Sequence, residues 1–211
     1  MTALIAIFFT SLVVAFSGAM MPGPLLTVTI SEATRRGTWA GFYLISGHAV
    51  LELILLVGLM FGLAPLFNNE MFFTIVAFAG GLIMLWMAWG MFKSLPTLTV
   101  NSNLTAEKEN NLILSGALMS LANPYWIIWW ATIGIGYIIT AQKFGWTGVI
   151  IFYFGHILGD MIWYCAISFA VGKGKQLFTD KIYRILIGVC GLFLVGFSFY
   201  LVFSGLQKII A

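Results

Sequence analysis

The segment SGAMMPGP at residues 17–24 interrupts the first apolar run of this chain, and SGALMSLANP at residues 115–124 interrupts a later run in a similar way. Pro22, Pro24 and Pro124 lack the amide hydrogen that an α-helix uses, and a proline also disfavours helix in the residue before it. We therefore expect a helix to break at both segments. Their shared order of Ser, Gly, Ala, Met and Pro indicates that the two halves of the chain are related.

The composition around these segments is strongly apolar. Of the 211 residues, 61% are hydrophobic and only 8% are charged, whereas soluble domains carry about 25% charged residues. So few charges cannot cover a water-soluble globule, and we predict an integral membrane protein with the lipid bilayer as a partner. The formal net charge of +3 is too small and scattered to favour a nucleic-acid partner. Cys165 and Cys190 form no metal or redox motif, so we expect no cofactor.

Six apolar stretches are long enough to cross a hydrocarbon layer of about 30 Å as helices. They are apolar on nearly every side, which favours helices over the alternating strands of a β-barrel. The predicted fold is an all-α membrane protein with six transmembrane helices, of which the first and fourth are broken at proline. The six predicted spans are roughly Ala3–Ile30, Trp39–Phe67, Met71–Phe92, Leu112–Ala141, Gly145–Val171 and Ile182–Leu206.

The basic residues predict the orientation of these spans. Short loops rich in Lys and Arg stay in the cytoplasm. The loops after spans one, three and five carry eight basic residues, and the opposite side carries two, so we expect both termini outside. The eight are Arg35, Arg36, Lys93, Lys108, Lys173, Lys175, Lys181 and Arg184, and the two are Lys143 and Lys208.

Further matches between the halves support an internal repeat. The matches keep their order and pair spans one with four, two with five, and three with six. Because each half has an odd number of spans, the second must enter the membrane upside down, as in many secondary transporters. We predict two inverted three-helix repeats, residues 1–100 and 101–211. The matches are Gly47-His48 with Glu52 against Gly155-His156 with Asp160, and Gly81-Leu82 against Gly191-Leu192.

The predicted helix breaks are candidate binding sites. Each break creates a helix N-terminus with free amides and partial positive charge, for which a carboxylate is a natural ligand. Backbone groups freed at this depth must face protein or a wet cavity. The alternative is a proline kink without function. The candidate substrate-binding residues are Pro22, Gly23, Pro24, Leu25, Asn123, Pro124, Tyr125 and Trp126.

Two histidine–carboxylate pairs lie within the predicted spans. His48 and Glu52 are one helical turn apart, as are His156 and Asp160, and the chain has no other histidine. A carboxylate in hydrocarbon is costly unless it is neutralised, paired or hydrated. Three interpretations are open. The pairs stabilise packing, or they exchange protons and couple transport to the proton gradient, or all four residues bind a divalent metal ion.

An aromatic run follows the second break: Tyr125, Trp126, Trp129 and Trp130. Aromatic residues of this kind anchor membrane helices at the lipid–water interface. The alternative is that they narrow a pathway or stack on a substrate.

These motifs resemble a known family. Pro22-Gly23-Pro24, followed by Arg35-Arg36-Gly37 and Ala40-Gly41, resembles the opening signature of the LysE/RhtB-type amino-acid exporters, and Asn123-Pro124 resembles their second signature. The resemblance covers nearly the whole chain. It implies a small prokaryotic plasma-membrane exporter of amino acids or related compounds, driven by the proton-motive force. Many members carry a basic residue after the second Asn-Pro, where this chain has Tyr125, and this departure bears on the substrate.

We therefore predict a secondary transporter in the prokaryotic plasma (inner) membrane that exports an amino acid or a similar small zwitterion. His48, Glu52, His156 and Asp160 are the predicted proton-coupling residues. The alternative function is divalent metal export through the same four residues. We expect no enzyme, because the sequence has no GxSxG or HExxH motif and no Ser or Cys with a convincing base partner.

Overall fold

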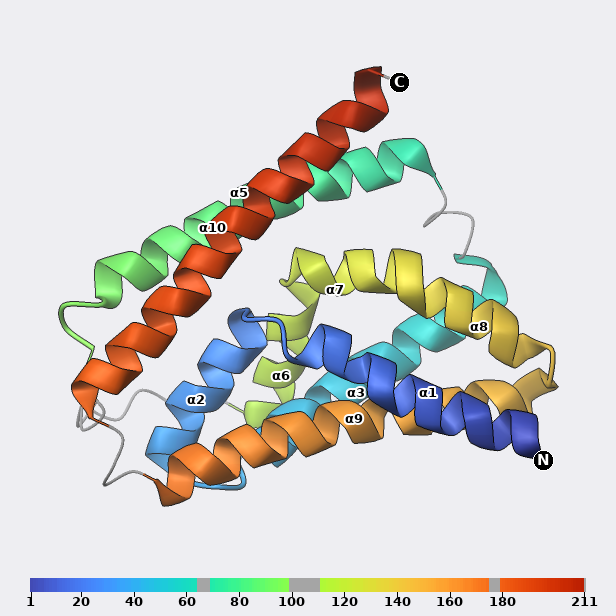
Figure 1. Ribbon diagram of the computed structural model, residues 1–211, viewed down its shortest axis with the longest axis horizontal. Helices are drawn as coiled ribbons and strands as arrows, with labels where there is room; N and C mark the ends of the chain where they lie inside the picture. The colour runs from blue at the N-terminus through green and yellow to red at the C-terminus, as the bar shows by residue number, and fades with distance from the viewer. Residues whose placement is uncertain (64–68, 99–110, 175–178, 211) are drawn as a thin grey trace.

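A computed structural model of the protein describes residues 1–63, 69–98, 111–174 and 179–210 (Figure 1). Helices make up nearly all of these described residues, and no strand occurs among them. Five of the described helices are long and apolar enough to cross a membrane, or six if one bent pair counts as a single span. The predicted all-α membrane architecture is confirmed.

The helices follow the predicted spans in order along the chain, but the first candidate span is Thr2–Ala19 and ends before Pro22, so the predicted span Ala3–Ile30 is too long. Two of the spans contain a short π-helical turn, η1 and η2. The elements are α1 (Thr2–Ala19), α2 (Pro24–Arg36), α3 (Ala40–Gly58), η1 (Leu59–Leu63), α5 (Glu70–Ser94), α6 (Leu112–Leu121), α7 (Pro124–Trp129), η2 (Trp130–Gly134), α8 (Ile135–Gln142), α9 (Gly145–Lys173) and α10 (Asp180–Ile210).

Two helices begin at prolines that the sequence singled out. Pro24 is the first residue of α2 and Pro124 is the first residue of α7. The first helical position tolerates proline well, because an amide there would have no partner within the helix. The segment Leu112–Leu121 and the segment Pro124–Gln142 meet at an angle of 64°. The second of these prolines therefore lies where the chain changes direction.

Helices that are distant in sequence pack side by side (Figure 1). α1 lies along α9, α3 packs against both α6 and α9, and α5 lies along α10. α7 packs on α5, where Gly80 lies against Pro124 so closely that a β-carbon at residue 80 would overlap the proline ring. The contact of α3 with α9 brings together the helices that carry His48 and His156.

Glycines allow the closest of these helix contacts. A β-carbon on Gly47 of α3 would overlap the carbonyl oxygen of Ile113 in α6, and a β-carbon on Gly116 of α6 would overlap the carbonyl oxygen of Leu44 in α3. Small residues let membrane helices approach in this way. Gly155 of α9 likewise lies close to α1, where a β-carbon would overlap the carbonyl oxygen of Phe8.

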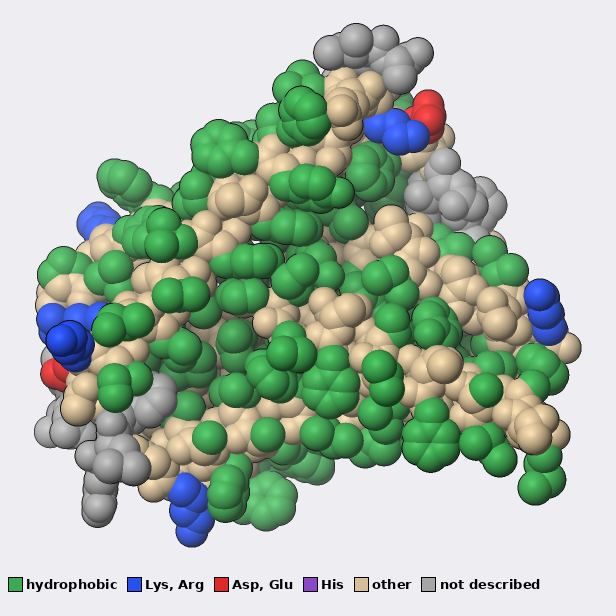
Figure 2. Space-filling model, viewed as in Figure 1, with side chains coloured by type: hydrophobic (Ala, Val, Ile, Leu, Met, Phe, Trp, Pro, Cys, Tyr) green, Lys and Arg blue, Asp and Glu red, His purple; other side chains and the backbone are tan. Residues whose placement is uncertain are grey.

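The surface fits a lipid environment. Figure 2 shows hydrophobic side chains over most of the visible face, with Lys and Arg side chains at its edges. Large apolar side chains are strongly exposed, such as Trp86 and Trp89 of α5 at 75% and 71%. A water-soluble protein rarely exposes so much contiguous apolar surface.

The close contact between α3 and α6 predicts the effect of adding a single methyl group. Gly47→Ala and Gly116→Ala force the two backbones apart, at a cost of about 1–3 kcal/mol from overpacking. Gly90→Ala is the control, because a β-carbon there meets nothing within 4 Å. Thermal unfolding in detergent should show lower midpoints for both interface variants and an unchanged or higher midpoint for the control. Equal midpoints in all three variants would contradict the close contact.

Candidate functional site

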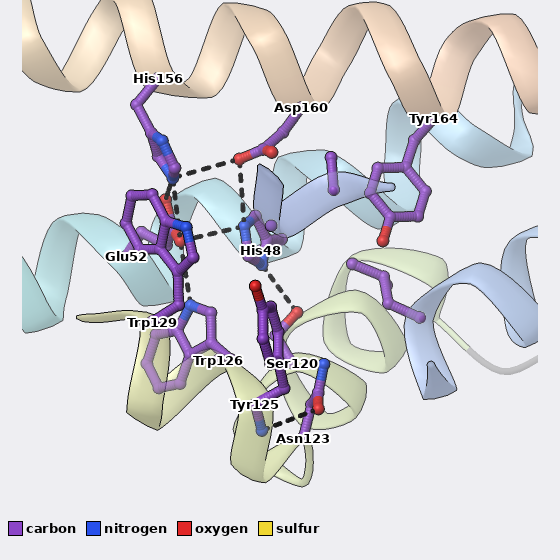
Figure 3. Close-up of a pocket in the computed structure, with 13 residues that line it drawn as sticks. His48, Glu52, Ser120, Asn123, Tyr125, Trp126, Trp129, His156, Asp160 and Tyr164 are labelled. Carbon is purple, nitrogen blue, oxygen red and sulfur yellow. Dashed lines mark hydrogen bonds and ion pairs between the residues drawn. The ribbon is translucent and has the colours of Figure 1, made fainter. Parts of the chain in front are cut away.

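Two histidines and two carboxylates meet between α3 and α9 (Figure 3). His48 Nε2 lies 3.1 Å from Glu52 Oε1 and 3.4 Å from Asp160 Oδ2. His156 Nε2 lies 3.1 Å from Glu52 Oε2 and 3.4 Å from the same Asp160 oxygen. Each imidazole therefore contacts both carboxylates, including the one on the other helix. We call these four residues the His–carboxylate ring.

All four side chains of the ring are buried. Glu52 is 1% exposed and Asp160 is 4% exposed. Burial strengthens electrostatic interactions and makes an unpaired charge very costly, so the contacts with the two imidazoles help to stabilise these carboxylates.

Two tryptophans complete the surroundings of Glu52. The indole N–H groups of Trp126 and Trp130 each donate a hydrogen bond of 2.9 Å to Glu52 Oε1. Both side chains are buried, Trp130 completely. Hydrogen bonds to a carboxylate are stronger than those between neutral groups. Of the two open interpretations, membrane-interface anchoring is therefore wrong for these tryptophans, which belong to the site.

A third tryptophan, Trp129, packs on the ring through His156. The Trp129 and His156 rings are stacked with centroids 4.6 Å apart. The Trp129 indole N–H donates to Ser17 Oγ at 3.1 Å, which ties it to α1. His156 Nδ1 has no hydrogen-bond partner among the described residues. The far side of this imidazole is therefore enclosed by aromatic side chains.

His48 has a polar partner on its far side, Ser120 of α6. His48 Nδ1 and Ser120 Oγ are 2.7 Å apart, and the same hydroxyl lies 2.8 Å from the Gly116 carbonyl oxygen. A hydroxyl has one hydrogen to donate. Ser120 either donates to the carbonyl and accepts from a protonated Nδ1, or donates to an unprotonated Nδ1. It can thus satisfy His48 in either state.

The ring forms part of the wall of a cavity of about 40 Å³. A cavity of this size has room for roughly three water molecules. Its walls come from α1, α2, α3, α6, α7 and α9, together with the residue before α7. The lining residues are Gly18, Ala19, Leu25, His48, Glu52, Ser120, Asn123, Tyr125, Trp126, Trp129, His156, Asp160 and Tyr164.

The structure brings half of the predicted substrate-binding residues to this cavity. Leu25, Asn123, Tyr125 and Trp126 line it, whereas Pro22, Gly23, Pro24 and Pro124 are not among its lining residues. Four lining residues were not anticipated as site residues: Gly18, Ala19, Ser120 and Tyr164. Isolated hydroxyl and methyl side chains carry no sequence signal in an apolar chain.

The two helix N-termini at the prolines differ. The Tyr125 amide of α7 donates to the Asn123 side chain at 3.1 Å, so Asn123 caps its own helix. Gly23 supplies no side-chain cap to α2, and the amides of Leu25 and Leu26 have no acceptor within the described residues. Of these two helix N-termini, the one of α2 therefore carries the amides without an acceptor among the described residues.

The ring also has a donor set that suits a metal ion. His48, Glu52 and Asp160 can each offer one ligand atom, and these atoms lie within 4.8 Å of one another. Imidazole nitrogen and carboxylate oxygen are ordinary ligands of zinc and similar ions.

Comparison with known proteins matches residues 16–205 to the family described as LysE type translocator. A putative amino acid efflux protein, YcgF of Bacillus subtilis (strain 168), is 23% identical over 207 residues, covering 97% of this chain and 99% of the relative. A leucine efflux protein of Enterobacter sp. (strain 638) is 25% identical over 199 residues, covering 90% and 92%. No solved structure matches the chain.

The hydrogen bond from Trp130 to Glu52 predicts a coupled loss of stability. Trp130→Phe removes one donor from a buried carboxylate, which should lower the free energy of unfolding by about 1–3 kcal/mol. In a Glu52→Gln background the same change should cost clearly less, because the charged acceptor is already gone. Trp89→Phe, on the exposed face of α5, is the control. Thermal unfolding in detergent compares Trp130→Phe, Glu52→Gln, the double variant and Trp89→Phe. An equal effect of Trp130→Phe in the wild-type and Glu52→Gln backgrounds would contradict the hydrogen bond.

Proposed function

The chain belongs to the LysE type translocator family, and on that premise we propose that it exports an amino acid or a similar small zwitterion in exchange for protons. The resemblance seen in the sequence is thereby confirmed at the level of the family. Two relatives named as efflux proteins align with nearly the whole chain, one for amino acids and one for leucine. A transporter rather than an enzyme is the function that this family supports.

The observation that carries the proposal is the His–carboxylate ring in the wall of a cavity. With both imidazoles protonated and both carboxylates ionised, the ring is neutral. Loss of one proton leaves a net negative charge in a buried place, which is costly unless a cation replaces the proton. A cationic group in the cavity can supply that charge. Binding of a substrate ammonium group beside the ring then favours release of a proton from the ring.

The free amides at the start of α2 are the proposed site for the substrate carboxylate. Leu25 lines the cavity, and its amide is one of two without an acceptor in the described residues. In this proposal Pro22, Gly23 and Pro24 position the helix end without touching substrate. Asn123 and Pro124 likewise position the start of α7, and the Asn123 side chain caps the Tyr125 amide.

We propose that the two halves, residues 1–100 and 101–211, are inverted repeats that supply equivalent parts. α3 and α9 each contribute one histidine and one carboxylate to the ring. α3 packs through Gly47 on α6 of the second half, and α9 packs through Gly155 on α1 of the first half. Exchange of the two packings would open the cavity to opposite sides in turn.

The proposed location is the prokaryotic plasma membrane, with both termini outside. The support is the uneven distribution of basic residues between the two sides of the predicted spans. Of the residues on the richer side, Lys108 and Lys175 lie outside the described residues.

Divalent metal export is the second candidate function, favoured by the convergent donors of His48, Glu52 and Asp160. Amino-acid export predicts that the purified protein binds no stoichiometric zinc, measured by isothermal titration calorimetry. Stoichiometric binding that disappears in His48→Ala would favour the metal transporter instead.

The proton-coupling proposal predicts the behaviour of two conservative variants. In proteoliposomes loaded with leucine, acidifying the outside should accelerate efflux by the wild type. Glu52→Gln and Asp160→Asn should lose most of this acceleration, because neutral amides cannot hold the exchanging protons. Glu70→Gln is the control, since Glu70 is exposed and pairs with Lys208 far along the chain. If both ring variants respond to the pH gradient as the wild type does, the ring is not the coupling site.

A further inference from the structure

Tyr164 is a cavity-lining side chain without a known role. It lies on α9, one helical turn after Asp160, and is 5% exposed. Figure 3 shows its ring extending from α9 with the hydroxyl directed toward the pocket. The hydroxyl makes no hydrogen bond within the described residues. The hydroxyl is therefore free to donate a hydrogen bond to a polar group in the cavity that Tyr164 lines.

The N-terminus of α2 faces the same space. Leu25 lines the cavity, and Leu25 and Leu26 belong to the same apolar cluster as Tyr164. Their amides have no acceptor in the described part of the chain, and α2 is a helix of 13 residues preceded by Gly23, which supplies no side-chain cap. Amides and the helix dipole favour a negative group here. The tyrosine hydroxyl adds a third donor of hydrogen bonds.

Asp160 provides the opposite charge in the same cavity. It is 4% exposed, and its Oδ2 accepts no hydrogen bond although two imidazole nitrogens lie 3.4 Å away. An ammonium group satisfies a buried carboxylate of this kind better than a contact of that length does. An ammonium group on Asp160 would also compete with the imidazole N–H groups of the ring.

We propose that Tyr164, the amides of Leu25 and Leu26, and Asp160 form a seat for the head group of a free α-amino acid. Tyr164 and the two amides bind the α-carboxylate, and Asp160 binds the α-ammonium group. The inference rests on the proposed export function and names the atoms that recognise its substrate. The cavity of about 40 Å³ suits this head group, while the substrate side chain needs the neighbouring helices to open. Tyr164 is thereby a specificity-determining residue that selects ligands with a carboxylate.

Leucine and two analogues test this seat. Isoamylamine keeps the ammonium group of leucine and lacks the carboxylate, whereas isocaproate keeps the carboxylate and lacks the ammonium group. Competition with labelled leucine efflux from proteoliposomes measures the half-inhibitory concentration of each. Tyr164→Phe should raise the half-saturating leucine concentration roughly ten-fold, as expected for a lost hydrogen bond to a charged group. Tyr164→Phe should raise the half-inhibitory concentration of isocaproate by a similar factor. It should change that of isoamylamine by less than about two-fold, because isoamylamine has no carboxylate to bind the hydroxyl.

The matched control is Tyr200→Phe, because Tyr200 lies on the exposed face of α10. Equal weakening of leucine and isoamylamine by Tyr164→Phe would assign Tyr164 to packing and overturn the inference, as would an unchanged affinity for leucine. The wild type provides a check that needs no variant. Both analogues should bind at least roughly ten-fold more weakly than leucine, and inhibition as strong as that of leucine would overturn the seat. A wild type that transports no free amino acid would instead overturn the proposed function.

Discussion

The carboxylate of Glu52 is 1% exposed within a membrane-spanning helix, and the need to compensate its charge shapes the surrounding structure. Lipid offers this carboxylate no hydrogen bonds, so the protein and the cavity must supply them. Two indole N–H groups donate hydrogen bonds to it, and two imidazole nitrogens lie 3.1 Å from its oxygens. The contact of α3 with α9 and the placement of α7 bring these groups to Glu52.

The close packing of the helices is what brings these groups together. Gly47 lets α3 lie against α6, which places Ser120 beside His48. Gly80 lets α5 lie against Pro124 at the start of α7, the helix that carries Trp126. Pro124 is the first residue of α7, so it lies at the start of the helix that carries Trp126. Replacement of a glycine at such a contact would move a donor away from the ring without touching the ring itself.

Much of this organisation can be predicted from the sequence. The apolar stretches identify the helices, and the spacing of four residues places each histidine beside its own carboxylate. The contacts across helices are not encoded by spacing, because they depend on how α3 and α9 pack. Trp126 is ambiguous in sequence because tryptophan serves both interfaces and cores. Asn123 caps α7 with its own side chain, and whether an asparagine does so or binds a ligand depends on a rotamer that no sequence pattern reveals.

The central claim is that substrate and protons share the His–carboxylate ring. The most direct measurement is the release of protons when leucine is added to the purified protein in a weakly buffered detergent solution. The account predicts proton release by the wild type, saturating with leucine, and none by the Glu52→Gln, Asp160→Asn double variant. Saturable leucine binding by the wild type without any proton release would contradict the account.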